Sequence, residues 1–308
     1  MIMTLRAQAS SAGGARRPAQ AVVKSLCLGD RRVLSVRRWP GTSDGTLVIL
    51  HGLLDSSEGW SPLAAGVSCS VVAFDLPGFG GSDVPERGSV SGYARDVAEG
   101  LGLLGIDRFT LVGHSLGGAV AAALAELVPD NVAALVLLAP AGFGRIGLAE
   151  AVSLPGLRHL VQAGLPWALS SPVAVTAGYL AMVTNGTLPD QEVVRRVTSR
   201  AAGLVGGARE GTRAVFDAGR ERTAFHRRRV DYDGPVFAVW GDRDRLVPPA
   251  HRHGVQAAFP QARVELWAGM GHHPIAERFD RLVALISHAA GLATARSEPS
   301  ARRTVTAR

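Results

Sequence analysis

Lysine is almost missing from this chain. Of the 33 basic residues only Lys24 is a lysine, and it lies in the N-terminal segment. A phosphate-binding loop of the pattern GxxxxGK needs a lysine beside the phosphates, and a pyridoxal Schiff base needs a lysine amine at the site. The sequence therefore argues against both kinds of enzyme, and we expect no cofactor.

Cysteine and long apolar runs are also scarce. Cys27 and Cys69 are the only cysteines, and with neither CxxC spacing nor a disulfide framework we expect two buried free thiols. Residues 1–20 lack the continuous apolar core of a secretory signal, so they predict a disordered lead. No run approaches the roughly 18 apolar residues of a membrane span. A cytoplasmic protein with no stable membrane span is the expectation.

The positive charge gives little support for a nucleic-acid partner. The net charge is +7, but arginines at the two ends of the chain supply most of that excess. A nucleic-acid groove requires basic residues gathered on one folded face. We therefore expect no nucleic-acid partner, and with 308 residues, 47% of them apolar, the chain can bury one large core.

The pattern along the chain alternates between strands and helices. Two strand-like runs between Val22 and Trp39 flank Gly29-Asp30 and predict a hairpin, and the run GTSDGT that follows predicts a turn. Apolar runs rich in β-branched residues then alternate with helical spacing as far as residue 140. Such alternation is typical of parallel βαβ units with both faces of the sheet covered. The predicted fold class is α/β, with a mostly parallel, doubly wound sheet.

The alternation lapses between residues 141 and 229. This segment carries helical pieces such as EVVRRVTSRAAGLV and TRAVFDAGRERTAF, and strands resume with PVFAVW. A helical excursion between two strands of one sheet predicts an inserted cap, or lid. We expect a core domain of residues 21–140 and 230–291, a helical cap of residues 141–229, and a disordered basic tail of residues 292–308.

The sequence Gly113-His114-Ser115-Leu116-Gly117 joins a predicted strand to a small-residue helix. GxSxG at such a junction describes a nucleophile elbow, in which flanking glycines allow a strained turn that exposes the serine. A serine hydroxyl needs a base and an acid to become a nucleophile.

Two later loops can supply that base and that acid, since each follows a predicted strand. The first contains Asp242 and Asp244, and the second contains His272 and His273. Their order along the chain, serine then aspartate then histidine, is the order that elbow-bearing hydrolases use.

Five segments together resemble the α/β-hydrolase family: HGLLDSSEGW, DLPGFGGSD, GHSLGG, GDRDRLVP and GHHPIAE. The resemblance extends over roughly residues 22–291 and is weakest in the expected cap. It implies Ser115 as nucleophile, Asp244 as acid and His272 as general base. It also implies an oxyanion hole made by the backbone N–H groups of Leu53 and Leu116.

Other polar residues in these motifs are expected to have structural roles. Four are expected to hold their own loops by hydrogen bonds: His51, Asp75, His114 and Asp242. His251 and His253 form an HxH pair, which we place on a surface helix rather than at a metal, because no third ligand can be identified. No metal site is predicted.

The identity of the elbow residue narrows the reaction within the family. Epoxide hydrolases and haloalkane dehalogenases use aspartate at the elbow, and hydroxynitrile lyases are expected to use a pocket lysine, so Ser115 indicates acyl chemistry. We expect cleavage of an ester, thioester or lactone through an acyl-enzyme. The charge-free part of the cap favours a small hydrophobic substrate. The candidate pocket residues are His114, Trp167, Tyr179, Met182 and His273.

Several alternatives use the same triad. Carbon–carbon bond hydrolases, cofactor-free perhydrolases and acyltransferases all remain open. A ligand-binding receptor on the same fold is an alternative of another class. The oligomeric state does not follow from the sequence.

Overall fold

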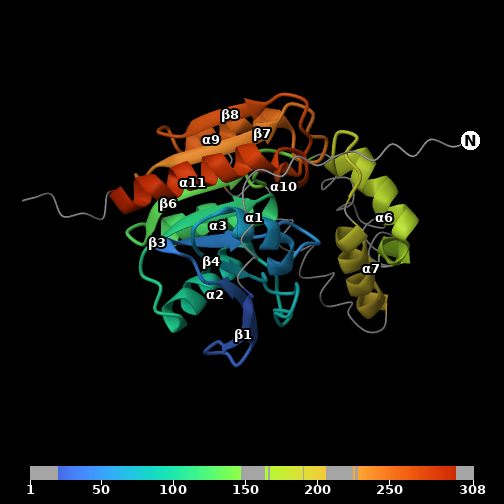
Figure 1. Ribbon diagram of the computed structural model, residues 1–308, viewed down its shortest axis with the longest axis horizontal. Helices are drawn as coiled ribbons and strands as arrows, with labels where there is room; N and C mark the ends of the chain where they lie inside the picture. The colour runs from blue at the N-terminus through green and yellow to red at the C-terminus, as the bar shows by residue number, and fades with distance from the viewer. Residues whose placement is uncertain are drawn as a thin grey trace, which may run out of the picture.

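The centre of the protein is an eight-stranded sheet flanked by helices (Figure 1). The computed structural model describes residues 20–146, 164–165, 167–189, 191–205, 225 and 228–295. The strand order is β1-β2-β4-β3-β5-β6-β7-β8; β1 and β2 pair antiparallel, β2 pairs antiparallel with β4, and all further pairs are parallel. The predicted doubly wound, mostly parallel α/β sheet is confirmed.

The strands form at the apolar runs that predicted them. They are β1 (Val22–Cys27), β2 (Val33–Trp39), β3 (Ser43–Leu50), β4 (Cys69–Phe74), β5 (Phe109–His114), β6 (Val132–Leu138), β7 (Val236–Gly241) and β8 (Arg263–Trp267). Every residue of β5, β6 and β7 is buried, as expected where helices cover both faces of a parallel sheet.

Helices cover the two faces in separate layers. The core helices are η1 (Ser57–Trp60), α1 (Ser61–Gly66), α2 (Val90–Leu103), α3 (Leu116–Leu127), η4 (Pro249–His251), α9 (Arg252–Ala258), α10 (Pro274–Glu277) and α11 (Phe279–Ala295). One apolar cluster joins α2, α3 and α9 to the sheet, and a second joins α1 and α11 to its other face. Helices therefore cover both faces of the sheet, and a functional site can form only at its edges or at the ends of its strands.

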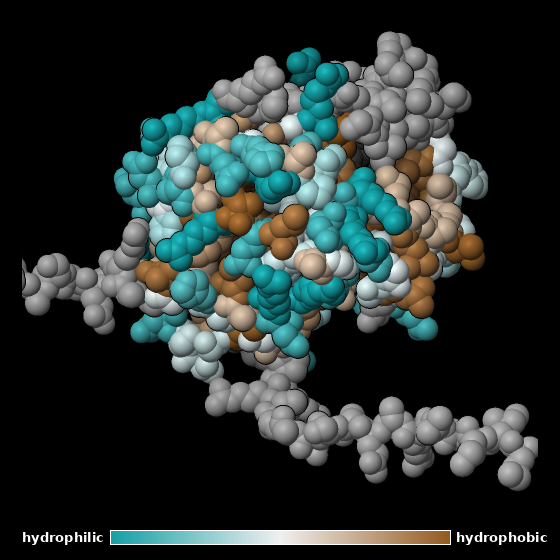
Figure 2. All heavy atoms as spheres, turned by 90° about the horizontal axis from the view of Figure 1, so that it is seen from above, coloured by the Kyte–Doolittle hydropathy of each residue, from teal (hydrophilic) through white to brown (hydrophobic). Residues whose placement is uncertain are grey.

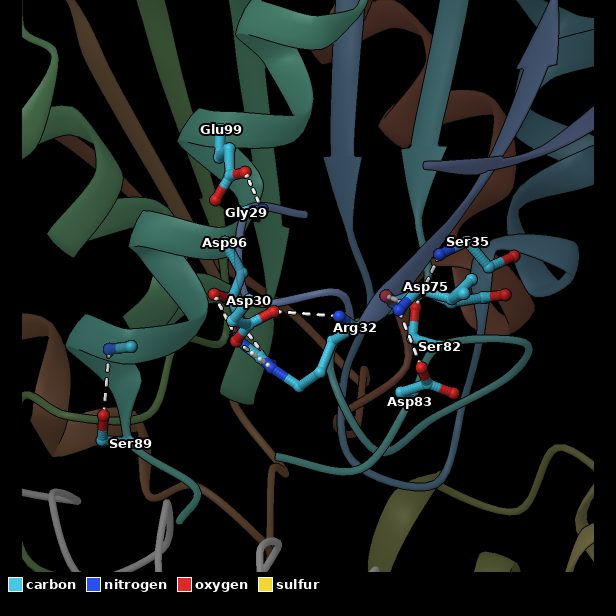
Figure 3. A network of polar contacts seen from close by, with 12 residues as sticks. Gly29, Asp30, Arg32, Ser35, Asp75, Ser82, Asp83, Ser89, Asp96 and Glu99 are labelled. Carbon is cyan, nitrogen blue, oxygen red and sulfur yellow. Dashed lines mark hydrogen bonds and ion pairs between the residues drawn. The ribbon is translucent and has the colours of Figure 1, made fainter. Parts of the chain in front are cut away.

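A polar network fixes the β1–β2 hairpin to α2 (Figure 3). Both terminal nitrogens of Arg32 donate to the Asp96 carboxylate at 2.8 Å, and Arg32 Nε donates to Asp30 at 2.6 Å. The backbone N–H of Gly29 donates to Glu99 at 2.6 Å. Such bidentate pairs add geometric specificity as well as energy, so they fix the position of the β1–β2 hairpin relative to α2.

The chain between β6 and β7 leaves the sheet. Its described helices are α6 (Pro172–Gly178), η2 (Tyr179–Val183), which is a π-helical turn, and α7 (Gln191–Val205), and α6 and α7 lie at one end of the molecule, apart from both sheet faces (Figure 1). The first expected helical piece is therefore α7. The second, residues 212–225, lies outside the described residues except for Phe225.

Expectations at the chain ends and in one turn need correction. Residues 292–295 belong to α11 instead of a disordered tail, because Leu292 and Ala293 still pack on the core. The rest of the tail, and the lead except for Gln20, lie outside the described residues. Strand β3 begins at Ser43, inside the expected turn, because a bulge with Gly45 at φ 94° shifts the register between Ser43 and Thr46.

Two side-chain placements also differ from expectation. Cys27 is exposed, because β1 is an edge strand in which five of the six residues are exposed, whereas Cys69 is buried. His251 is buried in η4, where Nε2 donates to the carbonyl oxygen of Arg145 at 3.1 Å. Among the described residues no helix is long and apolar enough to cross a membrane, and no three potential metal ligands are grouped.

Candidate active site

Ser115 occupies a strained turn between β5 and α3. Its φ of 53° and ψ of −116° lie outside the regions that side-chain-bearing residues ordinarily adopt. A Cβ at Gly113 would lie 2.3 Å from the carbonyl oxygen of Gly117, and a Cβ at Gly117 would lie 2.2 Å from that of Leu50. Only glycine fits at either position, so the two flanking glycines allow the turn that presents Ser115 at the carboxyl end of the sheet.

Asp244 and His272 contact each other at the carboxyl end of the same sheet. His272 Nδ1 lies 2.7 Å from Asp244 Oδ2, and the two side chains are 3% and 0% exposed. The other Asp244 oxygen accepts the backbone N–H groups of Leu246 and Val247 at 2.9 and 2.8 Å. An ionised carboxylate accepts only, so Nδ1 is the protonated nitrogen and Nε2 of His272 is left as a base.

The second aspartate of this loop points elsewhere. Asp242 Oδ1 accepts the backbone N–H of Gly269 at 2.7 Å, which closes the loop after β7 onto the turn after β8. Of the two aspartates that the sequence offers, only Asp244 contacts a histidine within the described chain.

His272 Nε2 is buried and has no hydrogen-bond partner among the described residues. Its ring lies beside that of His114, the residue before Ser115: His114 Nε2 donates to the carbonyl oxygen of His272 at 2.9 Å, and the two rings are 4.8 Å apart. No hydrogen bond joins Ser115 Oγ to His272 in the described chain. A serine hydroxyl moves among three staggered rotamers, and such bonds commonly tighten only in the substrate complex.

Two backbone N–H groups beside Ser115 have no acceptor in the described part of the chain: those of Leu53 and Leu116. Leu116 opens α3, where the helix leaves its first N–H groups unpaired. Leu53 follows Gly52, at which a Cβ would lie 3.3 Å from the Ser115 Cβ. Two free donors therefore flank the serine, as an oxyanion site requires.

Hydrogen bonds of His51 and Asp75 fix the loop that carries Leu53. His51 Nδ1 donates to the carbonyl oxygen of Gly52 at 2.7 Å, and His51 Nε2 accepts the backbone N–H of Leu76 at 2.9 Å. Asp75 accepts the backbone N–H groups of Ser57 and Gly81 at 2.7 and 3.0 Å. Both residues hold loops, the arrangement expected of them from the sequence.

Comparison with known proteins shows the family of this chain. A family model described as the alpha/beta hydrolase fold matches residues 45–179. The chain is 32% identical over 256 residues to an uncharacterised protein of Mycobacterium tuberculosis, spanning 79% of this chain and 74% of that protein. The chain belongs to the α/β-hydrolase family.

Two further similarities add detail about this α/β-hydrolase. It is 30% identical over 260 residues to the dihydrolipoyllysine-residue acetyltransferase component of the acetoin cleaving system of Cupriavidus necator, spanning 83% of this chain and 65% of that protein. A solved thermophilic esterase from Thermogutta terrifontis superposes with a TM-score of 0.66 at 20% identity, over 88% of this chain and 97% of the esterase. The latter likeness supports the fold alone.

The candidate pocket residues of this α/β-hydrolase are only partly brought together. The His273 ring lies 5.4 Å from the His114 ring and 5.7 Å from the Tyr179 ring, while Met182 is half-buried on η2. Apolar surface gathers at the end of the molecule where Figure 1 places α6 (Figure 2). Trp167 is 69% exposed. Its side chain therefore forms no wall above Ser115 in this arrangement.

Burial sets the charge of the histidines near the serine. Burial, together with nearby His272 and His273, holds the pKa of His114 well below its ordinary value of 6.5. Burial also lowers the pKa of His273, against the opposing effect of Asp55. Both rings are consequently neutral at physiological pH.

Sequence reasoning missed one residue that organises the site. Glu277 accepts the backbone N–H groups of Gly271 at 2.9 Å, Asn185 at 3.0 Å and His273 at 3.3 Å. The N–H of His272 in turn donates to the carbonyl oxygen of Val183 at 2.6 Å. The histidine loop is thus bonded directly to the chain that follows η2. The only signal in the sequence was that this glutamate closes the segment GHHPIAE.

A hollow of about 530 Å³ lies away from Ser115, between the β1–β2 turn and α2. Arg32, Ser89 and Asp96 are among its lining residues (Figure 3). Arg32 and Asp96 are already paired with each other there. The hollow holds no nucleophile beside a base, so it does not compete with the Ser115 site as a centre of chemistry.

Proposed function

We propose that the protein is a serine hydrolase that cleaves a carboxylic ester, thioester or lactone through an acyl-enzyme on Ser115. The observation that carries the proposal is the buried His272–Asp244 pair, with His272 Nε2 unpartnered among the described residues. The His272 ring lies 4.8 Å from that of His114, the residue before a serine in a nucleophile-elbow conformation. The domain organisation proposed with it is a core of residues 21–140 and 230–291 and a cap of residues 141–229.

The chemistry balances with these groups alone. Ser115 Oγ attacks the carbonyl carbon while its proton passes to His272 Nε2, and Asp244 stabilises the imidazolium. The oxygen of the tetrahedral intermediate accepts from the N–H groups of Leu53 and Leu116. As that intermediate collapses, His272 returns the proton to the leaving alcohol or thiol, and the acyl group stays on Ser115.

Water completes the cycle. His272 takes a proton from a water molecule, the hydroxide attacks the acyl carbon, and Ser115 leaves with the proton that His272 gives back. The products are the free acid and the regenerated enzyme. Losing one of the two oxyanion donors in such a cycle costs about 10²- to 10³-fold in kcat.

The first experiment is labelling with a fluorophosphonate, which reacts with activated serines. We expect the wild type and Ser89→Ala to gain one adduct each, and Ser115→Ala to gain none. Ser89 is a suitable control because it caps α2 at the hollow, away from the proposed triad. An adduct on Ser115→Ala, or none on the wild type, would refute the assignment.

Acyl transfer is the second candidate. The similarity to the Cupriavidus necator acetyltransferase component favours it, since a transferase passes the acyl group to an acceptor other than water. Adding alcohols or thiols to a working ester assay distinguishes the two, because a transferase yields the new ester or thioester in place of free acid. The same product analysis detects carbon–carbon cleavage and perhydrolysis. A wild-type protein that is neither labelled by the fluorophosphonate nor turns over any substrate would favour the receptor alternative.

A further inference from the structure

Two buried polar atoms near the proposed triad have no hydrogen-bond partner among the described residues: Tyr179 Oη and His273 Nδ1. They come from η2 and from the loop after β8, and their rings lie 5.7 Å apart. A buried polar group without a hydrogen-bond partner lowers the stability of the fold by about 1–3 kcal/mol, and folded proteins contain few such groups. Two such atoms on neighbouring rings indicate a place that accommodates a polar group.

This pair lies next to the nucleophile. His273 directly follows His272, and its ring is 5.4 Å from the ring of His114, which directly precedes Ser115. Tyr179 lies beyond His273, on the chain between β6 and β7. Neighbouring rings thus link the two unpaired atoms to the residue before the nucleophile, and the direction from Ser115 toward η2 is the one in which they lie.

The surroundings favour a neutral group. Burial raises the pKa of Tyr179, and the carboxylates of Asp55 and Glu277 raise it further, so the phenol keeps its proton and can donate it. Burial keeps His273 uncharged. Among the described residues, Arg196 is the one cation that acts on both rings, against the carboxylates of Asp55 and Glu277, and this balance of charge disfavours an anion.

We propose that Tyr179 Oη and His273 Nδ1 form a subsite for an uncharged oxygen of the substrate, a ketone or amide carbonyl or a hydroxyl, in addition to the carbonyl that is cleaved. The inference rests on the proposed acyl chemistry at Ser115 and narrows its substrate class. The substrate is then an ester, thioester or lactone whose apolar chain carries a second neutral oxygen. Tyr179 donates to that oxygen, and His273 Nδ1 donates to it or accepts from a hydroxyl.

The test compares p-nitrophenyl hexanoate with its 3-, 4- and 5-oxo analogues. For each enzyme, the kcat/KM of an oxo ester is divided by that of the hexanoate, and comparing this ratio between variants removes differences in intrinsic reactivity. We expect Tyr179→Phe to lower the ratio about 3- to 10-fold for the best oxo ester, the loss of one neutral hydrogen bond. The matched control is Tyr232→Phe, whose hydroxyl donates to Val132 in the core at 3.1 Å, and it should keep the wild-type ratio.

A binding measurement separates this inference from the proposed function. Ser115→Ala binds the same esters without cleaving them, so the ratio of their Kd values reports the subsite alone. Adding Tyr179→Phe to Ser115→Ala should lower the preference for the oxo ester by the same factor. If the Kd ratio does not change, the subsite is refuted, even if the fluorophosphonate labels Ser115. If Ser115 is not labelled, the proposed function is refuted, and the Kd ratio still decides whether the subsite exists.

A third measurement tests whether the subsite prefers a neutral oxygen to an anion. An ester of the same length that ends in a carboxylate should be a poorer substrate than the ketone. If the wild type prefers the carboxylate, the inference is wrong, and loss of that preference in Tyr179→Phe would show that the subsite binds an anion instead.

Discussion

Replacing Asp244 by asparagine should disable the proposed triad while preserving its shape. Asp244 accepts three hydrogen bonds, from His272 Nδ1 and from the backbone N–H groups of Leu246 and Val247. An asparagine has one acceptor oxygen, which the two backbone donors occupy, so its NH₂ group faces His272 Nδ1. The imidazole must then carry its proton on Nε2, which can no longer receive the proton of Ser115.

The expected loss follows from the lost charge. At an effective dielectric constant near 20, a carboxylate about 4 Å from an imidazolium contributes about 4 kcal/mol. That energy corresponds to about 10³-fold in rate, and the inverted tautomer raises the loss toward about 10⁴-fold. We therefore expect kcat/KM for ester hydrolysis to fall about 10³- to 10⁴-fold, with fluorophosphonate labelling slowed in parallel.

Asp242→Asn is the matched control. Asp242 accepts a single backbone N–H, from Gly269, and an asparagine oxygen can accept it equally well. This variant should stay within about threefold of wild-type kcat/KM, because the charge near His272 is unchanged. If Asp242→Asn were the more damaging of the two, the acid would be misassigned. If Asp244→Asn kept a tenth or more of the activity, a carboxylate would not orient His272 at all.

Three further predictions concern stability. Gly117→Ala should cost more than about 3 kcal/mol in urea unfolding, or prevent folding, since its Cβ would lie 2.2 Å from a β3 carbonyl oxygen, whereas Gly102→Ala, with nothing within 4 Å, should be neutral or stabilising; equal effects would contradict this. Because the pKa of His114 is lowered from 6.5 by burial, the unfolded chain binds its proton first, so stability is retained above pH 6.5 and declines below it, by up to about 1.4 kcal/mol per pH unit. Thermal melts between pH 7.5 and 5.5 should show a shallower decline for His114→Gln, and parallel declines would refute the cause. Asp96→Asn should lower the unfolding free energy by about 1–2 kcal/mol, since it breaks a partly buried bidentate pair with Arg32, and a change under about 0.3 kcal/mol would show that the pair adds nothing.

The sheet followed from local patterns, but two of its details did not. Apolar runs rich in β-branched residues predicted β3 to β7, where local sequence suffices because these strands are largely buried. Strand β8 is mostly exposed and forms the other edge of the sheet. The bulge at Gly45 was missed because pairing with β4 overrides the turn tendency of the local sequence. Exposure of Cys27 was missed because which strands form the edges of a sheet depends on strand order, not on the strand itself.

The site divides in the same way. Its motifs specified the elbow at Ser115 and limited the acid and the base to two candidates each, because turn chemistry and strand ends are written locally. Only the folded chain places Asp244 on His272 and turns Asp242 toward Gly269. The contacts of Glu277 with Asn185 and of Tyr179 with His273 likewise appear only in the folded chain, because they join segments about 90 residues apart in the sequence.

The sequence by itself determined the alternating α/β architecture and the glycine-flanked serine, since period, turn residues and chain order are local properties. The tertiary structure decided which carboxylate meets which imidazole, which candidate pocket residues lie together, and which polar atoms are buried without a partner. Those outcomes depend on distances between segments that only packing brings together, and burial is what gives each of those contacts its electrostatic strength.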